Sequence, residues 1–131
     1  MNSRFLTNIA LAIVGGFTIV ASQVWAPSIF MWLMLGAGAA AIGLATAAAL
    51  PRRGLAQRSL DGIIAALGAW TVVASLVFAG TVVTWLGLAS GAGFVALALA
   101  GLTLHELSTE RVVHSFEVPT NATSPEYAAV N

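Results

Sequence analysis

The 131-residue chain is far more apolar than a soluble domain. Hydrophobic residues make up 59% of it and charged residues 8%, and its mean hydropathy is +0.93. Soluble domains carry about a quarter charged residues, so this composition excludes that class and predicts an integral membrane protein. The chain contains no cysteine, which excludes disulfides and thiolate metal ligands. It has no basic patch beyond the three arginines of the central loop, so no nucleic-acid partner is expected.

Four apolar stretches are long enough to cross a bilayer as helices, for which about 20 residues are needed. They cover residues 6–25, 29–50, 60–79 and 82–104. Short connections at 26–28 and 80–81 join them in pairs, and Pro51 ends the second stretch before a linker in which Ser59 or Asp61 can cap the third helix. We therefore expect an all-α membrane protein whose residues 1–104 form four transmembrane helices, arranged as two tandem helical hairpins.

The two expected hairpins resemble each other in sequence. Residues 5–50 align without a gap to residues 58–103, and about a third of the aligned positions are identical. Two spans per copy make both copies enter the membrane in the same direction, which predicts a parallel internal repeat about a pseudo-twofold axis along the membrane normal. Identical pairs that are not alanine include Gly15 and Gly68, Thr18 and Thr71, Ser22 and Ser75, Trp32 and Trp85, and Gly38 and Gly91.

A stripe of small residues recurs on the second and fourth expected helices. Lipid gives helices no hydrophobic reason to associate, so close approach along small residues must supply their contact. We therefore expect the second and fourth helices to form the central pair, with a further contact at Gly87 and Gly91 on another face. The stripe comprises Gly36, Ala40, Gly43 and Ala47 and their aligned partners Ala89, Gly93, Ala96 and Ala100.

Few polar residues fall within the expected spans, and no ionisable residue lies at mid-membrane, where such a group would indicate function. Asn8 and the aligned Asp61 lie at helix ends, where capping or interfacial solvation is favoured over a substrate contact. The hydroxyls of Thr18, Ser22, Thr71 and Ser75 are expected to bond to carbonyls of their own helices, with a shared polar pocket as the alternative.

Residues 105–118 predict a short amphipathic helix on the cytoplasmic side. Thr109, Val112, Val113 and Phe116 recur at helical spacing, so they share one face. This helix either continues the fourth span or lies along the membrane surface. Its apolar face, Val112, Val113 and Phe116, is the candidate partner-binding surface, and docking on the arginines of the chain's own central loop is the alternative. Residues 119–131 are expected to form a flexible tail.

The sequence contains no constellation typical of catalysis. His105, Glu110 and His114 lie close in sequence, but a tetrahedral metal site needs more ligands than their spacing supplies, so a solvated polar face is favoured. No nucleophile is paired with a base and no phosphate-binding loop is present. We expect a non-enzymatic protein without a metal or cofactor and without a nucleic-acid partner.

The layout of the repeat resembles that of the small bacterial membrane proteins built from two SPW repeats. Gly68, Trp70 and Ser75 precede Trp85 and Gly91, and the first copy shows the same order. The Ser-Pro-Trp tripeptide itself is absent, and the family implies no activity for this chain. The residues of the first copy are Gly15, Phe17, Ser22, Trp32 and Gly38.

Two classes of function fit these features. The first is a scaffold or accessory subunit of a larger membrane complex, which the uncharged spans and the small-residue faces favour. The second is a small transporter or channel acting as an oligomer, although proton coupling would need an acidic group within the spans. The expected partners are the lipid bilayer and either other membrane protein subunits or further copies of this chain.

The arginines predict the orientation. All five basic residues are arginines, at positions 4, 52, 53, 58 and 111, and none lies in the two hairpin loops. Basic residues in short loops favour the cytoplasmic side, so both termini and the central loop are expected in the cytoplasm of a bacterial inner membrane. A signal peptide at residues 1–26 is the disfavoured alternative, since this segment is one copy of the repeat. The aromatic residues expected at the outer face are Trp25, Phe30, Trp32, Phe78 and Trp85.

Reporter fusions test this topology. A fusion after Asn131 and one within residues 52–58 should both read cytoplasmic, because the arginines hold those segments there. Fusions near Pro27 and Gly80 should read external. An external reading after Asn131 would contradict four spans with cytoplasmic termini.

Overall fold

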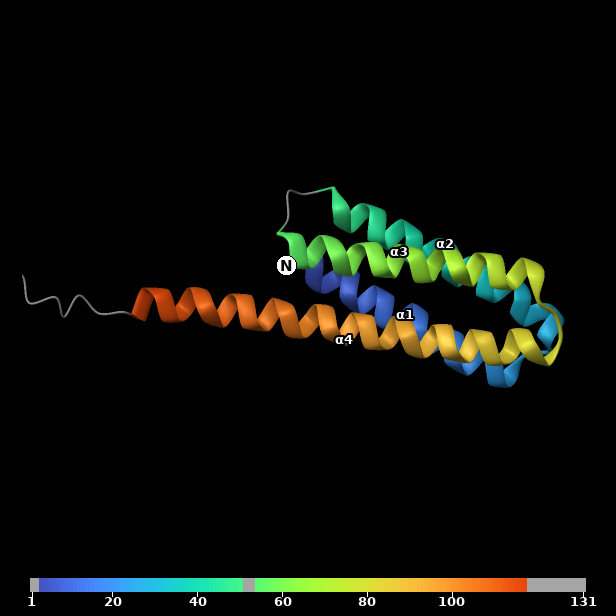
Figure 1. Cartoon of the computed structure of the whole chain (residues 1–131). Coiled ribbons are helices and arrows are strands. Elements are labelled where there is room, and N and C mark those ends of the chain that lie inside the picture. Colours follow the sequence, from blue (N-terminus) through green and yellow to red (C-terminus); the bar gives the residue numbers. More distant parts are fainter. Residues whose placement is uncertain (1–2, 51–53, 118–131) are drawn as a thin grey trace, which may run out of the picture.

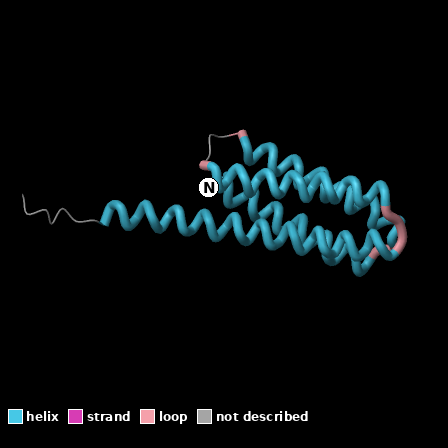
Figure 2. The backbone as a smooth tube through the Cα atoms, in the orientation of Figure 1, coloured by secondary structure: helices cyan, strands magenta, loops and turns pink. Residues whose placement is uncertain are grey.

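The computed structural model describes residues 3–50 and 54–117, with side chains up to residue 107. This part of the chain forms four helices: α1 (Ser3–Val24), α2 (Pro27–Ala49), α3 (Leu55–Val77) and α4 (Thr81–Glu117). Figures 1 and 2 show them side by side with short connections. Each helix, with α4 taken over Thr81–Leu107, is long and apolar enough to cross a membrane. The prediction of an all-α protein with four candidate spans is therefore confirmed.

The first hairpin turn is one residue shorter than expected, and the second, at residues 78–80, is one residue longer. Pro27 occupies the first turn of α2, where its missing N–H costs nothing, so only Trp25 and Ala26 separate α1 from α2. Gly80 has a φ of 64° and ends the second turn directly before α4, a conformation that favours glycine.

The third helix starts earlier than the hydropathy predicts. α3 begins at Leu55 with Gly54 as its N-cap, because Ala56, Gln57 and Arg58 are good helix formers although the stretch is not apolar. Ser59 donates a hydrogen bond to the carbonyl of Ala56 at 2.8 Å. The expectation that Ser59 or Asp61 caps this helix is therefore wrong.

The fourth helix is the longest element and continues beyond the bundle. It runs for 37 residues, and its C-terminal part, orange to red in Figure 1, projects past the ends of the other helices. The expected helix at residues 105–118 is thus the continuation of α4 as far as Glu117, not a separate element. The predicted tail at 119–131 lies outside the described residues.

The closest helix pairs join the two hairpins. α1 packs mainly on α4 and α2 mainly on α3, while the partners within each hairpin, α1 with α2 and α3 with α4, contact each other less. α2 and α4 also approach each other across the diagonal of the bundle, whereas the backbones of the described parts of α1 and α3 lie farther apart. The prediction of a central pair formed by α2 and α4 is therefore wrong, because the deepest packing lies elsewhere.

Backbone contact between glycines explains this pairing. A Cβ placed on Gly15 of α1 would lie 2.8 Å from the carbonyl oxygen of Gly91 of α4, and one on Gly91 would lie 2.9 Å from that of Gly15. Gly38 of α2 and Gly68 of α3 meet in the same way, at 2.8 and 3.0 Å. Only glycine allows such an approach without a shift of the backbone, and the approach supplies the van der Waals contact that helices in lipid need.

These two contacts involve aligned residues. Gly15 and Gly91 of one contact correspond to Gly68 and Gly38 of the other in the alignment of residues 5–50 with 58–103. The side chains nearest to the glycines correspond as well: Val95 and Ile19 beside the first contact, and Ile42 and Val72 beside the second.

The predicted small-residue stripe faces outward. Gly93 alone is half-buried, and a Cβ there would lie 2.9 Å from Leu67 of α3. The stripe therefore does not join α2 to α4, and that prediction is corrected: α2 turns a neighbouring row of small residues inward, toward α3. Helical spacing alone did not distinguish the two rows, because both consist of glycine and alanine. The exposed members are Gly36, Ala40, Gly43, Ala47, Ala89, Ala96 and Ala100, and the buried row on α2 is Ala37, Gly38, Ala41, Ala45 and Ala48.

Alanine substitutions test the glycine contacts. Gly38→Ala or Gly91→Ala should lower the free energy of unfolding by about 1–3 kcal/mol, because the added methyl meets a backbone carbonyl. Gly43→Ala is the control. A Cβ at Gly43 has nothing within 4 Å, so the change should be neutral or raise the free energy of unfolding by up to about 1 kcal/mol. Unfolding in mixed micelles measures both, and equal effects would contradict the contacts.

Candidate functional site

A site in an apolar bundle would be built from its buried polar side chains. In the described part of the chain these are Thr18, Ser22, Thr71, Ser75 and Ser90 along the spans, and Asn8 and Asp61 near the end that carries the N-terminus. The two groups behave differently.

The four hydroxyls repeated between α1 and α3 are bonded within their own helices. Each donates a hydrogen bond of 2.7 Å to a carbonyl three or four residues earlier. Such bonds satisfy the hydroxyl without a partner from another helix. The prediction of self-satisfied hydroxyls is confirmed over a shared polar pocket. The bonds run from Thr18, Ser22, Thr71 and Ser75 to Val14, Ile19, Leu67 and Val72.

Asn8 and Asp61 are more buried than expected. Each side chain is only 6% exposed. Asn8 lies against α4, where a Cβ on Gly101 would be 2.7 Å from the Asn8 Oδ1. Asp61 is the seventh residue of α3 and not a cap. The interpretation of this pair as capped or solvated helix ends is therefore wrong, because α3 starts earlier and places Asp61 inside the bundle.

A small cavity connects the two residues. It is open to a volume of about 10 Å³, enough for about one water molecule. Asp61 also borders a groove between α2 and α3, together with Thr46 and Arg58. The polar residues of the cavity lie on α1 and α3, and its apolar wall comes mainly from α2. Its lining residues are Arg4, Thr7, Asn8, Leu11, Leu44, Ala45, Ala48, Gln57, Asp61 and Ile64.

The chemistry of this lining is limited. Its side chains offer one carboxylate, one guanidinium and two amides, and the Thr7 hydroxyl donates to the carbonyl of Ser3 at 2.9 Å. Among the described residues of the lining there is no histidine and no second carboxylate, so these residues supply no pair of groups for general acid and base catalysis. The arrangement can hold a water molecule and a buried charge.

Metal ligands do not converge in the part of the chain whose side chains are described. No group of three His, Cys, Asp or Glu residues lies close enough there to hold an ion. His105 is half-buried on α4. The side chains of Glu110 and His114 lie outside the described residues.

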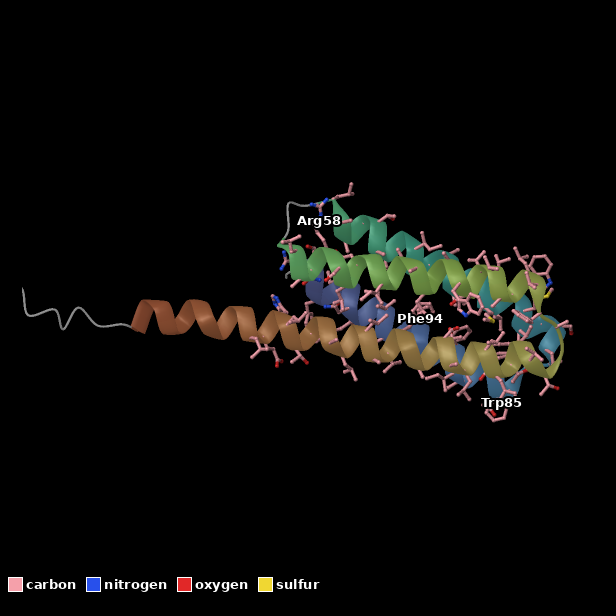
Figure 3. All side chains as sticks on the ribbon, in the orientation of Figure 1. Arg58, Trp85 and Phe94 are labelled. Atoms are coloured by element: carbon pink, nitrogen blue, oxygen red, sulfur yellow. The ribbon has the colours of Figure 1, made fainter. Side chains whose placement is uncertain are left out.

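The described arginines and three of the tryptophans, Trp25, Trp32 and Trp85, lie at opposite ends of the bundle. Arg4 and Arg58 lie at the end with the N-terminus, and Figure 3 shows Arg58 there and Trp85 directed outward from α4 near the hairpin turns. Trp32 and Trp85, which are aligned, are both 68% exposed. Phe30 was expected with them at the outer face, but it is fully buried. Its ring fills the space that a Cβ at Gly87 would occupy.

The candidate partner-binding residues lie on the extension of α4. Val112, Val113 and Phe116 belong to the helical backbone of α4, but their side chains lie outside the described residues. Arg52 and Arg53, the alternative docking site in the central loop, lie outside them too.

The alignment of Gly15 with Gly68 and of Gly38 with Gly91 was the signal that could have located the packing glycines.

The fold defines the class of the protein as a multi-pass membrane protein built from an all-α bundle with four candidate spans. No protein-family model matches the chain, and neither a curated protein nor a solved structure matches it. The resemblance to the SPW-repeat proteins is thus not supported by a family match.

Proposed function

We propose that this protein is a non-enzymatic subunit of a larger membrane complex in the bacterial inner membrane, with both termini in the cytoplasm. In this role it acts as a scaffold or accessory subunit and needs no cofactor. Its partners are other membrane proteins or further copies of the chain. The resemblance to two-repeat SPW proteins belongs to the same proposal.

The observation that carries this proposal is the outward direction of the small-residue stripe. Gly36 and Gly43 have no atom within 4 Å of a Cβ placed on them, so their close-approach surface is not used inside the chain. Ala89 and Ala96 are exposed at the aligned positions on α4. Helices in lipid associate through such small residues, so these faces suit contact with helices of another subunit.

The interior of the bundle is packed, which favours a structural subunit over a protein that encloses a transport path. Thr18 and Thr71 keep their hydroxyls bonded to their own helices, and Phe30 and Phe94 are fully buried. Polar groups that line a path would instead be left free to meet a substrate or its water. This filling favours a structural role.

The contacts between aligned glycines support a tandem duplication. We propose that residues 5–50 and 58–103 are two copies of one hairpin that entered the membrane in the same direction. The orientation is proposed from the arginines, and the aromatic side chains at the opposite end fit an outer interface.

The extension of α4 offers a second contact surface. Residues 108–117 add about 15 Å of helix beyond Leu107. The sequence places Val112, Val113 and Phe116 on one face of this segment. Its acidic residues make an anionic leaflet a poor partner, so we favour another protein, with docking on the central loop as the alternative.

One observation favours the second candidate function, a small transporter or channel acting as an oligomer. Asp61 is a buried carboxylate inside α3, bordering both the cavity and the groove. Buried ionisable residues in spans are frequent at transport sites. Asp61 lies near one end of the bundle, however, and the cavity is of water size.

Deletion of residues 105–131 tests which of the two surfaces binds a partner that co-purifies with the full chain in mild detergent. The four spans should still insert and fold, because their packing glycines lie before residue 105. Binding through the small-residue stripe predicts that the truncated chain keeps the partner. Binding through the extension of α4 predicts that the truncated chain loses it and that Phe116→Ser in the full chain weakens the same capture. A full chain that purifies alone as a monomer would contradict the proposed role.

A further inference from the structure

The two halves of the core differ in side-chain size where they meet. One buried cluster contains Phe94, Ala41, Ala45 and Ala98 together with Leu11 and Ile64. In the alignment of residues 5–50 with 58–103, these six form three aligned pairs: Leu11 with Ile64, Ala45 with Ala98, and Ala41 with Phe94. Residues exchanged by a twofold axis contact each other only beside that axis, so the pseudo-twofold axis runs through this cluster.

Only one of the three aligned pairs beside this axis combines a large side chain with a small one. Ala45 and Ala98 are identical and Leu11 and Ile64 are isomers, so both sides of the cluster are nearly the same except at Ala41 and Phe94. There the first hairpin supplies a methyl group and the second a benzyl group. Figure 3 shows Phe94 on α4 in the middle of the bundle. Two phenylalanines at this level would overfill the space, and two alanines would leave a cavity.

The second buried cluster also pairs a larger with a smaller aligned side chain, but here the larger one belongs to the first hairpin. It contains Phe30, Met34 and Val83 with the aligned pair Ala21 and Ala74. Phe30 aligns with Val83, so here the first hairpin supplies the larger side chain.

The residue aligned with Met34 is Gly87, which is also buried. The ring of Phe30 takes the place of the missing Gly87 side chain. A second copy of the first hairpin would bring methionine to that position, where the ring lies.

We propose that the two hairpins are a matched and non-interchangeable pair. The inner face of the first hairpin fits the inner face of the second and rejects a copy of itself, because Phe30 would meet methionine at one level and Ala41 would face alanine at the other. The specificity of the pairing lies in side-chain size beside the pseudo-twofold axis. The glycine contacts, which are the same in both copies, do not discriminate.

A size-exchange cycle in the full chain tests this proposal. Ala41→Phe places phenylalanine at both positions of the aligned pair 41 and 94, and Phe94→Ala places alanine at both. Each should lower the ratio of folded to unfolded protein in a mixed-micelle titration by about tenfold or more. The double variant A41F/F94A restores one large and one small side chain with the sides exchanged, and its ratio should return to within about fivefold of the starting protein.

A control separates this effect from a general intolerance of phenylalanine. Ala39→Phe adds the same ring to the exposed face of α2 and should be tolerated. If Ala41→Phe fails to accumulate in membranes, recovery of accumulation in A41F/F94A serves as the readout. The proposal would be overturned if the double variant lowered the ratio of folded to unfolded protein by the product of the two single effects. It would also be overturned if the double variant failed to accumulate in membranes while A39F accumulated.

Discussion

The structure depends on the approach of two pairs of helices to backbone contact. Lipid is as apolar as the side chains, so burial of apolar area contributes little and close van der Waals contact must hold the bundle. Gly15 with Gly91, and Gly38 with Gly68, bring carbonyl oxygens within about 3 Å of the positions that methyl groups would occupy. Both contacts join one hairpin to the other. The closest helix pairs thus form between the two hairpins, α1 with α4 and α2 with α3, and not between the two helices of one hairpin.

The other features of the interior follow from this approach. Where the helices are close, no room remains for side chains that need partners, and the neighbouring Thr18 and Thr71 are satisfied by their own helices. Phe30 and Phe94 fill the bundle at different levels, and both lie beside glycines: the Phe94 Cβ is 3.0 Å from a Cβ placed on Gly15, and the Phe30 ring takes the place of a Gly87 side chain. In this account the aligned glycines set the distance between the paired helices, and the unequal aromatic residues determine which hairpin pairs with which.

The sequence predicted the spans, the two hairpins and the self-bonded hydroxyls, because hydropathy, turn residues and local hydrogen bonding act over short stretches of chain. It did not predict which row of small residues faces inward, since rotation of a helix depends on the facing helix. Gly43 and Ala41 look alike in sequence, yet only Ala41 is buried. Asp61 was placed at a helix end because hydropathy starts α3 too late. Phe30 was assigned to the outer face because an aromatic residue beside a turn suits an interface as well as a core.

Cross-linking between helices tests the central claim most directly. The chain has no cysteine, so introduced pairs report alone. The helices of each pair run in opposite directions, since Asn8 lies by Gly101 and Gly15 by Gly91. Leu11 of α1 and Ala98 of α4 therefore lie at about the same level in one buried cluster, as do the aligned residues Ile64 of α3 and Ala45 of α2. A thiol cross-linker that spans about one helical turn, roughly 5 Å, should join the cysteine variants 11/98 and 45/64 in membranes and leave 19/72 unjoined. Efficient joining of 19/72, with 11/98 and 45/64 unjoined, would contradict the pairing of α1 with α4 and of α2 with α3.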